Sequence, residues 1–400
     1  MKATLFSILL ALILGFIPVQ NGLSASFGWI LIAFSIALLL SLPLIYAAAW
    51  TPLQKGEQNI TPRLIERASR DKQLLMASFA LLIFSLISIA IYYLLLNAPD
   101  LNPSYLFLGW LILFGVALDL MGLLINRIMS YLNPFKAAEI FTRNAKENCR
   151  LGNLDLVVDS IEALSEVSLR AIERSNTSLA AQGVLELREV GDTFFNSAKS
   201  FAALSEELKS LEKTRVDKVS YILFYLLGRF EMIHQKAAQK KFEPLATQVL
   251  SSLGKLALSS AKFDLTLVMH PILTLGRTAR LGEQLGLKDS GVKGEIVLLE
   301  VAKSLVRECD LTYVEIKSPF FTLIDNLDKI AKDLFKEDKE VSISTLTQPF
   351  LQLKEIMDDP KIATHQDTPS IKLEIDRVLS EYSALQAVML AMPKIPTAVS

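Results

Sequence analysis

Charged residues, cysteine and histidine are all scarce in this chain of 400 residues. Only 21% of the residues are charged, against about 25% in an ordinary soluble domain, and the mean hydropathy is +0.38. Two cysteines cannot build a disulfide framework, and three histidines leave little scope for metal chemistry. The net charge of −1 offers no basic surface of the kind that nucleic acid requires. The shortage of charge instead predicts that part of the chain lies in lipid.

The missing charge is concentrated in the first 126 residues. Residues 3–54 contain no Asp, Glu, Lys or Arg, and as helix they would extend about 78 Å, more than twice a hydrocarbon core of about 30 Å. A polar stretch at residues 20–26 divides this run, and two further apolar runs follow. Because lipid offers no partner for unpaired backbone groups, such runs predict spanning helices. We expect four, at residues 5–19, 28–50, 74–96 and 105–125.

The first of these spans has a second interpretation. Lys2, a short apolar run and small residues at 24–26 are also typical of a cleaved secretory signal peptide. Pro18 and the lack of a clean cleavage pattern favour an uncleaved helix. Cleavage would leave three spans with the same orientation.

Basic residues predict which side of the membrane the loops occupy. Five Lys or Arg residues lie in the segment 55–72, between the second and third spans, and none lies in the loops after the first and third. A second basic group follows the fourth span, at Arg127, Lys136, Arg143, Lys146 and Arg150. Lys and Arg are retained on the cytoplasmic side, so we expect both termini in the cytoplasm, in a bacterial inner membrane. We expect the second group to contact anionic headgroups.

Asp119 is the one acidic residue within a predicted span. An ionisable group in lipid is costly, so it usually faces protein or water. Gly115 and Gly122 share its helix face and are suited to close helix packing. Hydroxyl partners for Asp119 are available on the span 74–96, at Ser78, Ser85 and Ser88. The functional interpretation is a proton-linked or ion-linked site, and the structural one, which we favour, is a packing hydrogen bond.

Residues 127–400 are predicted to form a folded, cytoplasmic, helical part. They contain 35 basic and 37 acidic residues, apolar residues recur with a period near 3.6, and strand patterns are nearly absent. Asn133-Pro134 is typical of a helix start. We expect an all-α fold with a helical domain at 127–357, including a loop over Ser342–Gln348, then a linker at 358–369, a helix at 370–392 and a disordered tail at 393–400.

The cytoplasmic part also carries a regular spacing. Apolar residues at i, i+3 and i+6 or i+7 recur in sets that begin at residues 161, 184, 227, 250, 272 and 296. The single interval of 43 predicts a further helix near residues 204–211. Helices repeating every 22 or 23 residues favour an array of stacked helix pairs, similar in architecture to HEAT or armadillo repeats. An irregular helical bundle would give similar spacing.

No motif in the sequence indicates catalysis or a cofactor. Glycine-rich phosphate loops and nucleophile elbows are missing. Glu231-x-x-His234 lacks the second copy that a di-iron site needs, so we expect these two residues on a solvated helix face. The first hypothesis is therefore a non-enzymatic scaffold, anchored in the bilayer, whose helical array binds a protein partner. The second is a transporter or channel subunit that uses Asp119, and an enzyme ranks third.

Overall fold

The computed structural model describes residues 2–15, 23–97, 103–203, 212–287, 289–337 and 341–391. Helices account for 88% of these residues, and none of them lies in a strand. This confirms the all-α class. By contacts the chain divides into two units, Met1–Ala137 and Ala138–Ser400, which are described separately. The predicted tail at 393–400 lies outside the described residues, as does the helix expected near 204–211.

Within its described residues the first unit contains the helices α1 (Lys2–Gly15), α2 (Leu23–Asn59), α3 (Leu64–Ser69), α4 (Lys72–Asn97) and α5 (Pro103–Leu132). Three segments are long and apolar enough to cross a membrane, namely Trp29–Asn59, Lys72–Asn97 and Tyr105–Leu132. They contain nearly all of the spans predicted at 28–50, 74–96 and 105–125. The span predicted at 5–19 coincides with α1 as far as Gly15, and its last four residues lie outside the described residues.

Packed aromatic side chains form part of the core of the first unit. Helix α4 packs against α2 and α5, and α1 packs against α5. Trp110 of α5 is buried, stacks on Phe114 and donates a hydrogen bond from Nε1 to Ser88 Oγ of α4 at 2.8 Å. Most other large apolar side chains of these helices point outward, which suits a hydrocarbon environment.

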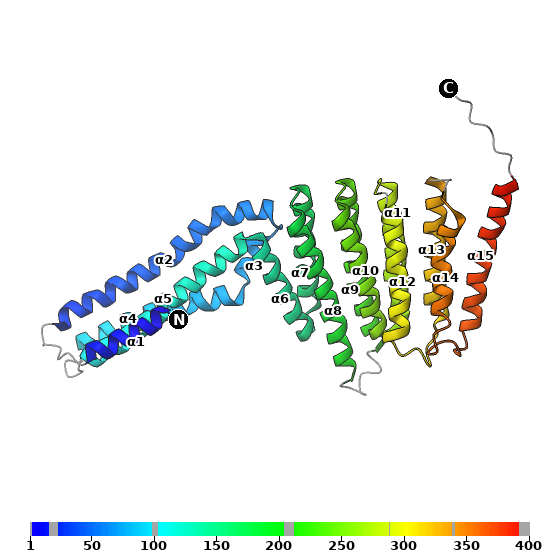
Figure 1. The fold of residues 1–400 in the computed structure, drawn as a ribbon. Coiled ribbons are helices and arrows are strands. Elements are labelled where there is room, and N and C mark those ends of the chain that lie inside the picture. The colour runs from blue at the N-terminus through cyan, green and yellow to red at the C-terminus, as the bar shows by residue number, and fades with distance from the viewer. Residues whose placement is uncertain are drawn as a thin grey trace, which may run out of the picture. The chain divides into compact units, whose positions relative to one another are not determined.

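The second unit consists of helices that lie side by side in chain order (Figure 1). Helix α6 (Pro134–Leu151) enters it and is followed by two layers. We call the first the odd layer: α7 (Leu154–Glu173), α9 (Glu212–Gln239), α11 (Met269–Gln284), α13 (Lys317–Glu337) and α15 (Thr368–Ala391). The even layer is α8 (Thr177–Ala203), α10 (Glu243–Phe263), α12 (Ser290–Glu308) and α14 (Ile343–Ile356). Each helix contacts its chain neighbour in the other layer and the next helix of its own layer.

The regularly spaced apolar residues predicted from the sequence lie in the core of the second unit. Each of the six sets lies within one helix, from α7 to α12, and every member is buried except Ile296, which is 45% exposed. The interval of 43 residues is largely filled by two long helices, because α8 has 27 residues and α9 has 28. The spacing of the apolar sets along the sequence therefore follows from the fact that each set belongs to a different helix.

Helix starts were predicted in part. Asn133 Oδ1 accepts hydrogen bonds from the backbone N–H groups of Phe135 and Lys136, at 3.0 and 3.4 Å, ahead of Pro134. The loop predicted over Ser342–Gln348 is wrong, because α14 begins at Ile343 and Ser342 caps it by accepting from Thr345 N–H at 3.2 Å. The Ser and Thr residues suggested a loop, but they serve as a cap and as the polar face of a helix.

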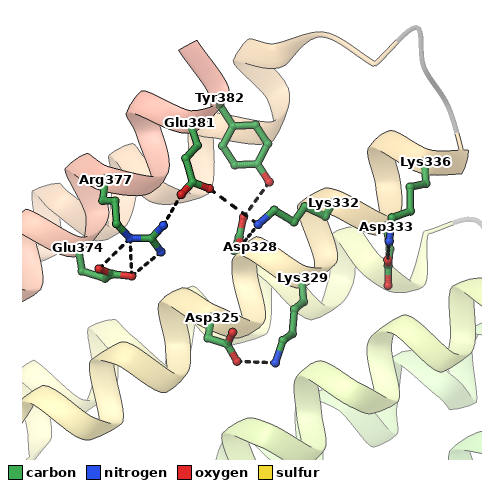
Figure 2. A network of polar contacts seen from close by, with 10 residues as sticks. All are labelled: Asp325, Asp328, Lys329, Lys332, Asp333, Lys336, Glu374, Arg377, Glu381 and Tyr382. Atoms are coloured by element: carbon green, nitrogen blue, oxygen red, sulfur yellow. Dashed lines mark hydrogen bonds and ion pairs between the residues drawn. The ribbon is translucent and has the colours of Figure 1, made fainter. Parts of the chain in front are cut away.

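Helix α15 is fixed to α13 by an apolar face and a polar network (Figure 2). Tyr382 donates a hydrogen bond from its hydroxyl to Asp328 Oδ1 at 3.1 Å, and Lys332 Nζ lies 2.5 Å from Asp328 Oδ2. Arg377 pairs with Glu374 and Glu381 along α15. The buried face of α15 is formed by Ile371, Ile375, Val378 and Tyr382.

Candidate partner-binding groove

Asp119, the acid within the apolar segment Tyr105–Leu132, caps helix α1. Its carboxylate accepts hydrogen bonds from Thr4 Oγ1 at 2.5 Å, from Thr4 N–H at 3.0 Å and from Ala3 N–H at 3.2 Å. The first N–H groups of a helix have no partner within it, and the helix dipole favours a negative charge beside them. The carboxylate therefore satisfies backbone donors at the start of α1 that have no partner within the helix.

The serines predicted to bind Asp119 make other bonds. Ser85 Oγ donates to the Leu81 carbonyl at 3.1 Å, Ser78 Oγ lies 2.7 Å from the Tyr46 hydroxyl, and Ser88 accepts from Trp110. The hydroxyl that reaches Asp119 belongs to Thr4 instead.

The two glycines near Asp119 differ in their surroundings. A Cβ at Gly115 would overlap Ser7 of α1, so the glycine allows α1 to approach α5 closely. At Gly122 nothing in the described part of the chain lies within 4 Å of a Cβ position.

Arg127 belongs to a buried ion pair in the first unit. Its Nη2 lies 2.6 Å from Asp71 Oδ2, and the Tyr131 hydroxyl donates to the same oxygen at 2.6 Å. Burial alone would raise the pKa of Asp71, but the hydrogen bonds from Tyr131 and Arg127 outweigh it and hold the pKa below its usual value. Sequence reasoning missed Asp71, whose signal was its place directly before the apolar helix α4.

The remaining basic residues lie on α6. Lys146 pairs with Glu189 of α8, whereas Lys136, Arg143 and Arg150 are exposed. Their spacing of seven residues places these three on one side of the helix.

A groove on the odd layer runs across α9, α11 and α13, and we call it the α9–α13 groove. It encloses about 540 Å³, within the range of ligand-binding clefts. It is lined by Phe224, Leu227, Gly228, Glu231, His270, Leu273, Thr274, Arg277, Arg280, Asn326 and Lys329.

The floor of the α9–α13 groove is apolar and open. Phe224 is 51% exposed and Leu273 is 44% exposed, although a folded domain usually buries such side chains. The Phe224 ring packs on the edge of His270, with centroids 4.6 Å apart, and burial lowers the pKa of His270. At Gly228 nothing described lies within 4 Å of a Cβ position, so this part of the groove is empty of protein atoms.

The rim of the groove is mainly basic. Three of its lining residues are cations, Arg277, Arg280 and Lys329, against one acid, Glu231. Arg277 pairs with Glu231 at 2.5 Å, Arg280 with Asp333 at 2.6 Å, and Lys329 with Asp325 at 2.7 Å, the last shown in Figure 2. The Arg280–Asp333 pair is partly buried, whereas Arg277 and Lys329 are exposed. Exposed ion pairs contribute about 0–1 kcal/mol, so the carboxylates of a partner can replace those of Glu231 and Asp325 at little cost.

The apolar surface continues along α9. Tyr221, Phe224 and Met232 are exposed, and their spacing places them with Gly228 on one side of the helix. Met232 borders a second hollow of about 510 Å³ between α7 and α9. The signal in the sequence was that α9 is apolar on two faces, because Leu223, Leu227 and Phe230 fill the core.

The other residues considered for chemistry are dispersed. Among the described residues no group of three or more His, Cys, Asp or Glu side chains is placed to hold a metal ion. His234, predicted to lie on a solvated face, is fully buried. That prediction was wrong because α9 packs on neighbours from both layers.

Comparisons with protein-family models, with curated proteins and with solved structures found no match to this chain.

Proposed function

We propose that the chain is a membrane-anchored scaffold whose second unit binds a protein partner through the α9–α13 groove. The observation that supports this most directly is the exposed apolar stripe of α9 and α11, bordered by cations that are held only in surface ion pairs. Apolar patches with a charged border are typical of interaction sites. The complementary partner is a segment, most simply an amphipathic helix, that carries apolar side chains flanked by carboxylates.

The anchor in this proposal is the first unit, with α1 as a fourth membrane helix. Fourteen residues of α1 extend about 21 Å, less than the hydrocarbon core of about 30 Å, so the fourth crossing depends on residues beyond Gly15. The basic residues of segment 55–72 and those after the last span favour cytoplasmic termini, and we retain the bacterial inner membrane as the proposed location.

The second unit is proposed to be a solenoid-like array of helix pairs. The alternation of contacts between the odd and even layers supports it, as each helix contacts near neighbours, which is typical of stacked repeats. Beyond its buried face, α15 presents charged residues such as Asp376, which pairs with Lys354 of α14. A polar outer face is typical of a capping element.

The transporter hypothesis gains no comparable support. The three hydrogen bonds that Asp119 accepts from α1 support a packing role for this residue rather than an ion-linked one.

Site-specific photocrosslinking in living cells tests the scaffold proposal. A photoreactive residue at Leu273 is expected to capture one protein reproducibly, and Gly228→Trp should abolish this adduct by filling the groove floor. The matched control is Leu185→Trp, because Leu185 is an exposed residue of α8 in the even layer and its replacement should leave the adduct unchanged. Equal crosslinking in both variants, with both proteins correctly inserted, would contradict the groove as the binding site.

A further inference from the structure

A second hollow lies on the even layer, between α12 and α14, and we call it the α12–α14 cleft. It encloses about 410 Å³ and is lined by Glu295, Ile296, Leu299, Ser344, Thr345, Gln348, Pro349 and Gln352. One wall therefore offers apolar side chains and the other offers hydroxyls and amides. No Lys or Arg is among these lining residues.

The side chain of Glu295 lines this cleft without a partner among the described residues. It is 8% exposed, and it makes no hydrogen bond or ion pair with any residue that the structure describes. Buried carboxyl groups are normally paired, because an isolated charge in a low-dielectric interior is costly. An unpaired carboxyl that lines an open cleft is thus suited to a positively charged group from outside the chain.

A second acid on α11 strengthens this preference. Glu283 is 4% exposed and its carboxylate lies against Gly291, one turn before Glu295 on α12. Burial, together with the negative charge of Glu283, raises the pKa of Glu295 to about 8. Tyr382 of α15 also interacts electrostatically with Glu295, while α14 presents uncharged polar groups. Among the described residues that line the cleft there is thus a carboxyl group and no cation, and Glu283 adds negative charge nearby.

We propose that the α12–α14 cleft binds a small organic cation with a primary ammonium group and a short apolar body. An ammonium group has three donors, and the cleft offers the Glu295 carboxylate, the hydroxyls of Ser344 and Thr345, and the Gln348 amide oxygen as acceptors. Ile296 and Leu299 provide an apolar surface for the rest of the molecule, which explains why Ile296 is exposed where the other members of the apolar sets are buried.

Binding is coupled to proton release, because the ammonium group pairs with the ionised carboxylate. Below the pKa of about 8, each fall of one pH unit reduces the ionised fraction tenfold. The apparent affinity should therefore rise about tenfold from pH 6 to pH 7. A ligand held only by apolar contact would show no such dependence.

Saturation-transfer NMR on the full-length protein in lipid nanodiscs tests this proposal. The probe is n-butylammonium, with n-butanol as its uncharged counterpart. We expect saturable binding of the amine, about tenfold tighter at pH 7 than at pH 6, and little binding of the alcohol.

The variants separate the cleft from nonspecific attraction. Glu295→Gln should abolish binding of n-butylammonium, whereas Glu300→Gln, at an exposed acid of the same helix, should leave it unchanged. Amine binding that survives in Glu295→Gln, that the alcohol matches, or that is undetectable in the unaltered protein would overturn the proposal. The site lies in the opposite layer from the α9–α13 groove, so its failure would leave the scaffold proposal standing.

Discussion

Substituting glutamine for Glu295 is predicted to stabilise the second unit, and to do so more strongly as the pH rises. The pKa of this carboxyl is about 8 in the folded chain, against 4.5 for an unperturbed glutamate. The folded state thus holds a proton that the unfolded state has released, and stability is lost as the pH rises from 4.5 to about 8. Glutamine is neutral at every pH and carries no such loss.

The size of the effect follows from the difference between the two pKa values. One pKa unit corresponds to about 1.4 kcal/mol. At pH 7 the pH is about 2.5 units above the pKa of the carboxyl in the unfolded chain, whereas the carboxyl in the folded chain is still largely protonated. The free energy of unfolding should therefore be about 3 kcal/mol higher in the variant. At pH 5 the same calculation gives less than about 1 kcal/mol.

Hydrogen exchange in the full-length protein provides the measurement. Amides of α12 should exchange on the order of 100-fold more slowly in Glu295→Gln than in the unaltered protein at pH 7, with a much smaller difference at pH 5. Comparing both proteins at one pH cancels the intrinsic dependence of exchange on pH. Glu300→Gln should match the unaltered protein. A Glu295→Gln difference that is absent at pH 7, or equal at both pH values, would refute the reasoning.

Three further predictions concern other polar groups. Asp71→Ala should lower the free energy of unfolding of the first unit by about 3 kcal/mol, because it leaves Arg127 buried and unpaired, and Arg127→Met in the same chain should restore part of the loss in a thermal unfolding assay. Thr4→Val should speed hydrogen exchange of α1 by a factor of about five, because it removes the hydroxyl hydrogen bond to Asp119; unchanged exchange would contradict the capping role. Burial lowers the pKa of His234 to about 4 from 6.5, so stability is lost as the pH falls from 6.5 towards 4, and His234→Leu should avoid a loss of about 2 kcal/mol at pH 5, measured by exchange of α9 amides.

Much of the fold follows from local patterns. Runs without charge located three long apolar helices, because lipid excludes charged groups whatever the tertiary contacts are. The residues Asn133 and Pro134 located the start of α6, because that geometry is set within one turn. The segment Ser342–Gln348 was misread, since the same hydroxyls suit a loop or a capped helix and the choice depends on burial of Leu346 and Phe350.

The candidate sites could not be predicted from local sequence patterns, because they depend on contacts between helices. Asp71 meets Arg127 across 56 residues, and the contact depends on how two helices are rotated about their axes. Phe224 and Leu273 are residue types that usually lie in a core, so the sequence alone does not reveal that they are exposed. Their exposure depends on which helix faces the neighbouring helices cover. No pattern in the sequence distinguishes Glu295 from a surface acid, because its place in the cleft depends on how α14 packs against α12.

The cap that Asp119 forms on α1 has a consequence for how the membrane unit is made. Thr4 and its acceptor are separated by 115 positions, so the ribosome completes α1 long before it adds the carboxylate. Until then the leading N–H groups of α1 lack this acceptor, and α1 reaches its final contacts only after α5 has been made. Of the described helices in the first unit, the one translated first is thus among the last to complete its packing.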